Sequence, residues 1–145
     1  MATGLLAFSL AGCDSSKNEV VVDQATPKNT VGTWTLKKGI KDEKGFSPIQ
    51  GAPITLEVTE KETFDGVSGC NNYMGSVINE GGELVFSVGG TTMKMCADDI
   101  MKSESSFLDV LATVDKGNLE TKRGKTELHL LSPDETSELI FSPQG

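Results

Sequence analysis

Hydrophobic and polar residues alternate with a period of two in several short segments between residues 31 and 97. In the segment APITLEVTE, Ile54, Leu56 and Val58 fall on one side of an extended strand, and the residues between them fall on the other. The segment LVFSV, residues 84–88, repeats this pattern, and the glycines of NEGGE just before it indicate a hairpin. The pattern therefore predicts short antiparallel strands, each with one buried face.

A helical period replaces this alternation after residue 97. The residues that recur at the spacing of one helix face are Ile100, Glu104, Phe107, Leu108, Leu111 and Val114. Asp98 or Asp99 is predicted to cap the start of the helix, and short strands return after Gly117. The predicted fold is α+β and mostly β: a curved antiparallel sheet or partial barrel of short strands, with one covering helix at about residues 98–114.

The N-terminal segment has a different character. LLAFSLAGC, residues 5–13, is an apolar run that ends in Leu-Ala-Gly-Cys, which matches the bacterial lipobox. In such a pattern a signal peptide, here residues 1–12, is removed, and Cys13 receives a lipid that anchors the chain in a membrane. No Lys or Arg precedes the apolar run, and a start codon further upstream would explain this. We expect a protein of the bacterial cell envelope, anchored on the periplasmic side of the inner or outer membrane.

Residues 13–30 are mostly polar and are predicted to form the lipidated cysteine and a flexible tether, followed by a folded domain at residues 31–143. The apolar residues Val20–Val22 interrupt this tether. They also suit an edge strand, which is the alternative interpretation.

The charge of the chain argues against some classes of binding partner. The formal net charge is -8, and the 13 Lys and Arg residues are scattered along the sequence rather than gathered in one run. This distribution predicts no electrostatic surface for nucleic acid or for anionic lipid headgroups. We expect a monomer without a nucleic-acid partner, which reaches the membrane through Cys13 and has an envelope protein or a lipid as its ligand.

Cys70 and Cys96 are the two cysteines of the body. Disulfides form and persist in exported proteins, and with Cys13 consumed by lipid the body keeps an even pair. We predict a disulfide between them, which closes a loop of about 25 residues and stabilises the fold by roughly 3–4 kcal/mol. A catalytic thiol is the alternative, and His129, the single histidine, would have to be its base. The alternation in TELHLL predicts that His129 is exposed on a strand.

Sulfur-containing residues cluster around the second cysteine. Met93, Met95, Cys96 and Met101 are soft ligands of the kind that Cu(I) prefers. On a strand, however, Met93 and Met95 share one face and Cys96 lies on the other, so core packing is the predicted role of the methionines. We predict no metal site, no cofactor and no catalytic residue.

Two asparagines follow the first cysteine. Asn71 and Asn72 suit a binding site, but asparagine also tolerates left-handed backbone and bonds to its own backbone in turns. With Gly69 and Gly75 on either side, we favour a bulged or sharply bent strand. Lys94 either faces a ligand or is an exposed strand lysine that discourages edge pairing.

The segments GCNNYMGS and GGTTMKMC, followed by the helix, resemble the META domain family. An early WTL and a closing LIF occur in the family's order, so the resemblance spans about Val31 to Phe141. It implies a small secreted or lipid-anchored domain without an established catalytic activity, and the HslJ-like heat-shock members imply a link to stress. We therefore expect a non-enzymatic binding or structural module. The alternative is a pilot or chaperone-like lipoprotein with a hydrophobic groove for an acyl chain or a partner peptide.

Overall fold

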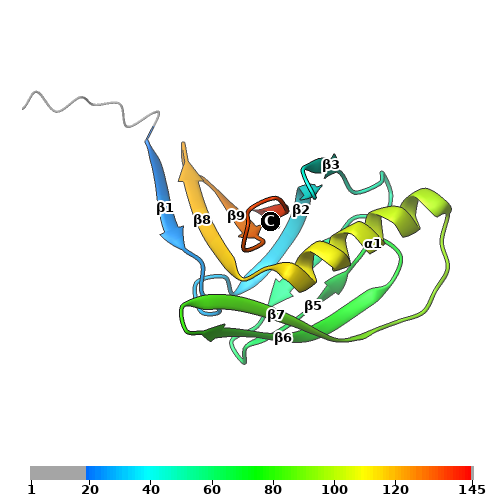
Figure 1. Cartoon of the computed structure of the whole chain (residues 1–145), viewed down its shortest axis with the longest axis horizontal. Coiled ribbons are helices and arrows are strands. Elements are labelled where there is room, and N and C mark those ends of the chain that lie inside the picture. The colour runs from blue at the N-terminus through cyan, green and yellow to red at the C-terminus, as the bar shows by residue number, and fades with distance from the viewer. Residues whose placement is uncertain (1–18, 145) are drawn as a thin grey trace, which may run out of the picture.

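The computed structural model describes residues 19–144 (Figure 1). The predicted signal peptide, residues 1–12, and the predicted lipidation site, Cys13, lie outside the described residues. Residues 19–144 form ten strands and one helix. In chain order these are β1 (Val20–Gln24), β2 (Gly32–Lys41), β3 (Lys44–Phe46), β4 (Thr55–Val58), β5 (Thr63–Val67), β6 (Asn72–Glu80), β7 (Glu83–Thr91), α1 (Asp98–Thr113), β8 (Lys116–Lys122), β9 (Lys125–Leu131) and β10 (Glu138–Pro143).

The strands form one antiparallel sheet that curls without closing. Their order is β1-β8-β9-β10-β2-β4-β5-β6-β7, and β3 pairs with β2 beside this path. The two ends of the sheet approach each other near the start of β7. The Leu84 N–H in β7 donates to the Asp115 carbonyl just before β8, at 2.8 Å, and Gln24 Nε2 of β1 donates to the Gly82 carbonyl just before β7, at 3.0 Å. β1 and β7 remain the edge strands. The α+β, mostly β, class and the curved sheet predicted from the sequence are thereby confirmed.

The helix α1 covers one side of the sheet and packs against β2, β7 and β10 (Figure 1). Its bounds agree with the prediction of about residues 98–114. The predicted aspartate cap is wrong, because Ala97 is the N-cap residue and no side chain caps this end. Asp98 and Asp99 lie in the first turn instead, where negative charge suits the positive end of the helix dipole. Within residues 19–144, no helix has the length and apolar character needed to cross a bilayer.

Aromatic side chains fill the space between α1 and the sheet. Phe107 of α1 lies edge-on to Tyr73 of β6, with ring centroids 5.4 Å apart, and to Phe141 of β10, at 6.3 Å. Phe64 of β5 continues the cluster toward Tyr73 at 5.8 Å and Phe86 at 5.4 Å. All five rings are at most 3% exposed, so the core is packed with side chains rather than hollow.

The flexible tether predicted for residues 13–30 is wrong where the structure describes it. Val20 lies opposite Lys122 and Gln24 opposite Asn118, so β1 pairs with β8 as an edge strand. The chain then turns through residues 26–30, where Thr30 is fully buried. The alternative interpretation of Val20–Val22 is the correct one. Composition alone favours a tether here because the partner strand lies far along the chain.

Candidate functional site

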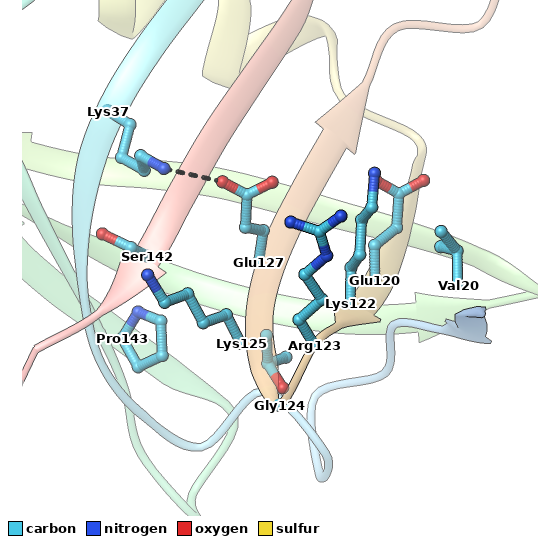
Figure 2. A pocket seen from close by; sticks show the side chains of 11 residues that line it. Val20, Lys37, Glu120, Lys122, Arg123, Gly124, Lys125, Glu127, Ser142 and Pro143 are labelled. Carbon is cyan, nitrogen blue, oxygen red and sulfur yellow. Dashed lines mark hydrogen bonds and ion pairs between the residues drawn. The ribbon is translucent and has the colours of Figure 1, made fainter. Parts of the chain in front are cut away.

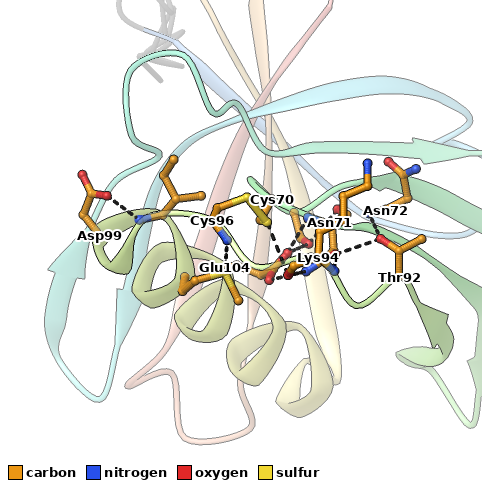
Figure 3. The surroundings of a disulfide bond; sticks show 11 residues. Cys70, Asn71, Asn72, Thr92, Lys94, Cys96, Asp99 and Glu104 are labelled. Atoms are coloured by element: carbon orange, nitrogen blue, oxygen red, sulfur yellow. Dashed lines mark hydrogen bonds between the residues drawn. A yellow bond between two sulfur atoms is a disulfide. The ribbon is translucent and has the colours of Figure 1, made fainter.

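The two cysteines of the body join the turn before β6 to the loop before α1 (Figure 3). Cys70 and Cys96 form the predicted disulfide, with their Cα atoms 5.9 Å apart. Cys96 is not on a strand, contrary to the sequence interpretation, because β7 ends at Thr91 and residues 92–97 form an irregular loop. The disulfide therefore ties the irregular segment that enters α1 to the sheet.

Glu104 projects from α1 into the interior beside this disulfide and is only 5% exposed (Figure 3). Its Oε1 accepts hydrogen bonds from the Ser68 hydroxyl and, at 2.7 Å, from the Asn71 N–H. Its Oε2 accepts a hydrogen bond from Asn71 Nδ2 at 2.9 Å. Both carboxylate oxygens are thus satisfied by donors from the junction between β5 and β6. These bonds fasten the first half of α1 to the sheet.

Asn71 binds the loop before α1 on its other side. Its Oδ1 accepts from the Thr92 hydroxyl at 2.9 Å and from the Lys94 N–H at 2.6 Å. Its Nδ2 also donates to the Lys94 carbonyl at 3.1 Å. Asn71 is 5% exposed, and both polar atoms of its side chain are bonded inside the protein. Asn71 therefore has a structural role, because its side chain holds the loop through hydrogen bonds. Lys94 takes part in these hydrogen bonds through its backbone and not through its side chain.

Glycines on either side of these residues permit the sharp bend that the sequence predicts. Gly69 has a φ of +104°, in a region that residues with a side chain rarely adopt. A Cβ on Gly75 would lie 1.9 Å from the Ser87 carbonyl oxygen, so only glycine lets β6 and β7 approach this closely. The ladder between these strands also shifts register between Met74 and Gly75. The motif GCNNYMG therefore describes a bend, a disulfide and a buried hydrogen-bond network.

His129 is not placed as the base of a catalytic thiol. It lies in β9, and its side chain is 13% exposed rather than exposed as predicted. Its Nε2 lies 2.7 Å from Glu120 Oε2 and 3.4 Å from Glu127 Oε1, and its Nδ1 lies 3.7 Å from Glu138 Oε2. The prediction failed because β8 and β10 flank β9, and their long acidic side chains cover the imidazole. Neither body cysteine is a free thiol, because Cys70 and Cys96 are bonded to each other.

The sulfur residues around Cys96 do not gather as a ligand set. The Cys96 N–H donates to the thioether of Met101, at 3.4 Å. Met93 and Met95 are 89% and 84% exposed, so their predicted packing in the core is wrong. Most of the alternating segment TTMKM lies in an irregular loop, so its methionines are not on the buried face of a strand. Within residues 19–144, no group of three or more His, Cys, Asp or Glu residues is arranged to hold a metal ion.

A cavity of about 1000 Å³ opens on the face of the sheet opposite the core (Figure 2). Its lining comes from β1, β2, β10 and above all the turn between β8 and β9. The charged residues that line it are Lys37, Glu120, Lys122, Arg123, Lys125 and Glu127. Hydrogen bonding to Lys37 is the main reason why the pKa of Glu127 lies below its usual value of 4.5. Lys122, Arg123 and Lys125 are close in the sequence, and the fold adds Lys37 to them.

The sequence analysis missed the role of Glu104, although a signal was present. Glu104 lies on the apolar face of the predicted helix together with Phe107 and Leu111, where a carboxylate needs buried donors. The spacing identifies the anomaly. It does not identify Ser68 and Asn71 as the donors, because that pairing depends on how α1 lies on the sheet.

Two solved structures are similar to this chain. A protein from Burkholderia xenovorans, solved by NMR, superposes with a TM-score of 0.67 and 25% sequence identity, over 84% of this chain and 90% of that one. A DUF4847 family protein from Bacteroides vulgatus superposes with a TM-score of 0.54 and 12% identity, over 79% of this chain and 94% of that one, which bears on the fold alone. No curated protein matches the chain. The family model for the META domain matches residues 28–145, which include the bend, the disulfide and the whole of α1. The chain therefore belongs to the META domain family.

Proposed function

We propose that this protein is a non-enzymatic, lipid-anchored protein of the bacterial cell envelope whose META domain acts as a binding or structural module. The lipid would be attached to Cys13, at the end of the lipobox pattern. A role in stress tolerance is part of this proposal and derives from the resemblance to HslJ-like family members.

The observation that carries the non-enzymatic part is the internal use of the reactive groups. Cys70 and Cys96 are bonded to each other, and Glu104 and Asn71 bond to Ser68 and to the loop before α1. His129 is surrounded by glutamates on a different part of the sheet. A nucleophile needs an adjacent base and an accessible position, and these residues are arranged to hold the fold together.

The packing of the core counts against an acyl-chain groove, which was the alternative interpretation. The rings of Phe64, Tyr73 and Phe107 touch one another between α1 and the sheet. The three cavities described for residues 19–144 are lined by surface residues and not by these rings. A partner peptide would have to bind on the surface.

Metabolic labelling with radioactive palmitate in a bacterial host tests the lipid anchor. The wild-type chain should incorporate label, and Cys13→Ser should incorporate none. The double variant Cys70→Ser/Cys96→Ser is the matched control, because it loses two cysteines but keeps the lipobox, and it should label like the wild type. Equal labelling of Cys13→Ser and the wild type would refute the anchor.

A further inference from the structure

Four basic residues gather at the end of the molecule where the described chain begins (Figure 2). Lys122 and Lys125 flank the two-residue turn between β8 and β9, and Arg123 is the first residue of that turn. Lys37 reaches the same cavity from β2. Arg123 and Gly124 both have positive φ, at 53° and 75°, which is the geometry of a tight hairpin turn. This turn holds the flanking lysines opposite each other, since Lys122 pairs with Lys125.

Each acidic residue of the cavity has a partner of its own. Glu127 Oε2 lies 2.9 Å from the Lys37 ammonium, and Glu120 Oε2 lies 2.7 Å from His129 Nε2. Within residues 19–144, neither Lys122 nor Lys125 forms an ion pair, and both are exposed. The cavity therefore has four cationic side chains against two carboxylates, in a chain whose net charge is -8.

This basic end lies next to the point where the chain would leave the membrane. Val20, the first residue of β1, pairs with Lys122, and six residues separate it from Cys13. Seven peptide units span at most about 25 Å, whatever their conformation. A lipid on Cys13 would therefore keep the turn between β8 and β9 near the headgroups. The loop between β7 and α1 lies at the opposite end of the molecule (Figure 1).

We propose that this end of the molecule, formed by Lys37, Lys122, Arg123 and Lys125, binds the anionic headgroups of a phospholipid bilayer and orients the domain on the membrane. The proposal rests on the lipid anchor for its setting, but the binding surface belongs to the folded domain itself. Val20, Val21 and Val22 are 46%, 49% and 53% exposed on the neighbouring strand, so apolar side chains accompany the cations. The exposed Met93 and Met95 would then face away from the bilayer.

The proposed surface departs from the sequence expectation that the chain offers nothing to anionic lipid. That expectation rested on the net charge and on the spread of the basic residues along the whole chain. At physiological salt the Debye length is about 8 Å, so a lipid headgroup responds to the charges nearest to it. The four cations near the turn therefore outweigh carboxylates on the far side of the molecule.

Vesicle binding tests the proposal without the anchor. A chain that begins at Asp14 keeps every described strand, α1 and the disulfide, and it lacks both Cys13 and the apolar run. This chain is sedimented with vesicles of phosphatidylcholine, alone or mixed with phosphatidylglycerol, at low salt. Each basic residue near an anionic surface strengthens binding several-fold, so we expect the triple variant Lys122→Gln/Arg123→Gln/Lys125→Gln to weaken binding to the mixed vesicles at least about tenfold.

A matched variant controls for total charge. Lys28, Lys44 and Lys61 are exposed elsewhere in the fold, and changing these three to Gln should alter binding by less than about twofold. The double variant Lys122→Gln/Lys125→Gln keeps Arg123 and guards against misfolding of the turn, and circular dichroism checks each variant. Equal binding by the triple and control variants, or binding that does not depend on phosphatidylglycerol, would overturn the proposal. Since palmitate labelling reports only on Cys13, the anchor and the basic end can fail separately.

Discussion

The two ends of this molecule use their polar residues in opposite ways. At the start of α1, Ser68, Asn71 and Glu104 are buried and bonded to one another beside a disulfide. At the end formed by β1 and the turn between β8 and β9, the charged side chains are exposed and the edge strand carries three exposed valines. The first end is held by many specific contacts, and at the second end Lys122, Lys125 and the three valines are exposed.

This difference separates the conspicuous motif, which supports the fold, from the basic residues that we propose bind the membrane. The glycines, cysteine and asparagines of GCNNYMG look like a reactive site but stabilise a bend and the attachment of a helix. Lys122 and Lys125 belong to no such motif, yet they remain open to a charged surface. In this domain, the conspicuous motif belongs to the end that is held by the disulfide and the buried hydrogen bonds.

The largest expected loss of stability is at the end held by the disulfide and the buried hydrogen bonds. Glu104→Ala leaves the Asn71 N–H and one Asn71 Nδ2 hydrogen without an acceptor in the interior, while the Ser68 hydroxyl can still donate to the Asn71 carbonyl. Each unsatisfied buried donor costs about 1–3 kcal/mol, so we expect the free energy of unfolding to fall by about 3 kcal/mol or more. Urea denaturation followed by tryptophan fluorescence measures this loss.

Two further variants refine that measurement. Glu104→Gln keeps an acceptor oxygen for Ser68 and the Asn71 N–H but turns an amide toward Asn71 Nδ2, so it should lose less than the alanine variant. Glu60→Ala, on an exposed residue, should leave the free energy of unfolding within about 0.5 kcal/mol of the wild type. A loss below 1 kcal/mol for Glu104→Ala would mean that the network adds little, and the contrast between the ends would disappear.

Removal of the disulfide should have the next largest effect. Cys70 and Cys96 are 26 residues apart in the sequence, and cross-links of this length stabilise proteins by about 3 kcal/mol in the chain-entropy model. We expect Cys70→Ser/Cys96→Ser to lose this amount in urea denaturation. Reductant should lower the wild type to the stability of the double variant and leave the variant unchanged. If reductant changes both proteins equally, the assignment of the effect to this disulfide is wrong.

The end formed by β1 and the turn between β8 and β9 should tolerate change. Replacement of Val20, Val21 and Val22 by Thr keeps β-branched side chains on an edge strand where the valines are about half exposed. We expect the free energy of unfolding to fall by less than about 1 kcal/mol in total. Hydrogen exchange should also show faster exchange at the β1 amides than in α1 around Leu111. Equal protection of the two segments would contradict the comparison.

The smallest effect concerns the ion pair beside the basic cavity. Hydrogen bonding to Lys37 lowers the pKa of Glu127 below 4.5, so the folded state favours the carboxylate. The stabilisation is complete above about pH 4.5 and is lost as the pH falls through the lowered pKa. Lys37→Gln should therefore lower stability at neutral pH by less than about 1 kcal/mol, because the pair is partly exposed.

Denaturation at a series of pH values tests this ion pair. The difference between the wild type and Lys37→Gln should shrink as the pH drops below 4.5. A difference that stays constant down to acid pH would show that Lys37 acts through packing rather than charge.

Local patterns predicted the strand faces and the helix because their periods are properties of the chain itself. Ile54, Leu56 and Val58 are all buried, and α1 covers the expected residues. The same reasoning failed at Met93, where alternation continues into a loop, and at β1, where a polar segment pairs with a strand that is remote in sequence. Alternating apolar and polar residues identify the buried face of a strand only if the segment pairs with a neighbouring strand. The sequence does not say where that neighbour is.

The sequence by itself determined the mostly β fold and the position of the helix, because these depend on local period. It also determined the pairing of the body cysteines, because residues 31–143 contain two of them. Only the tertiary structure brought Glu104 to Ser68 and Asn71, and Lys37 to the turn at Lys122–Lys125. Both sets of neighbours consist of residues that are far apart along the chain. Hydrogen bonds and electrostatic fields act over distances in space, and the curled sheet and the docked helix set those distances.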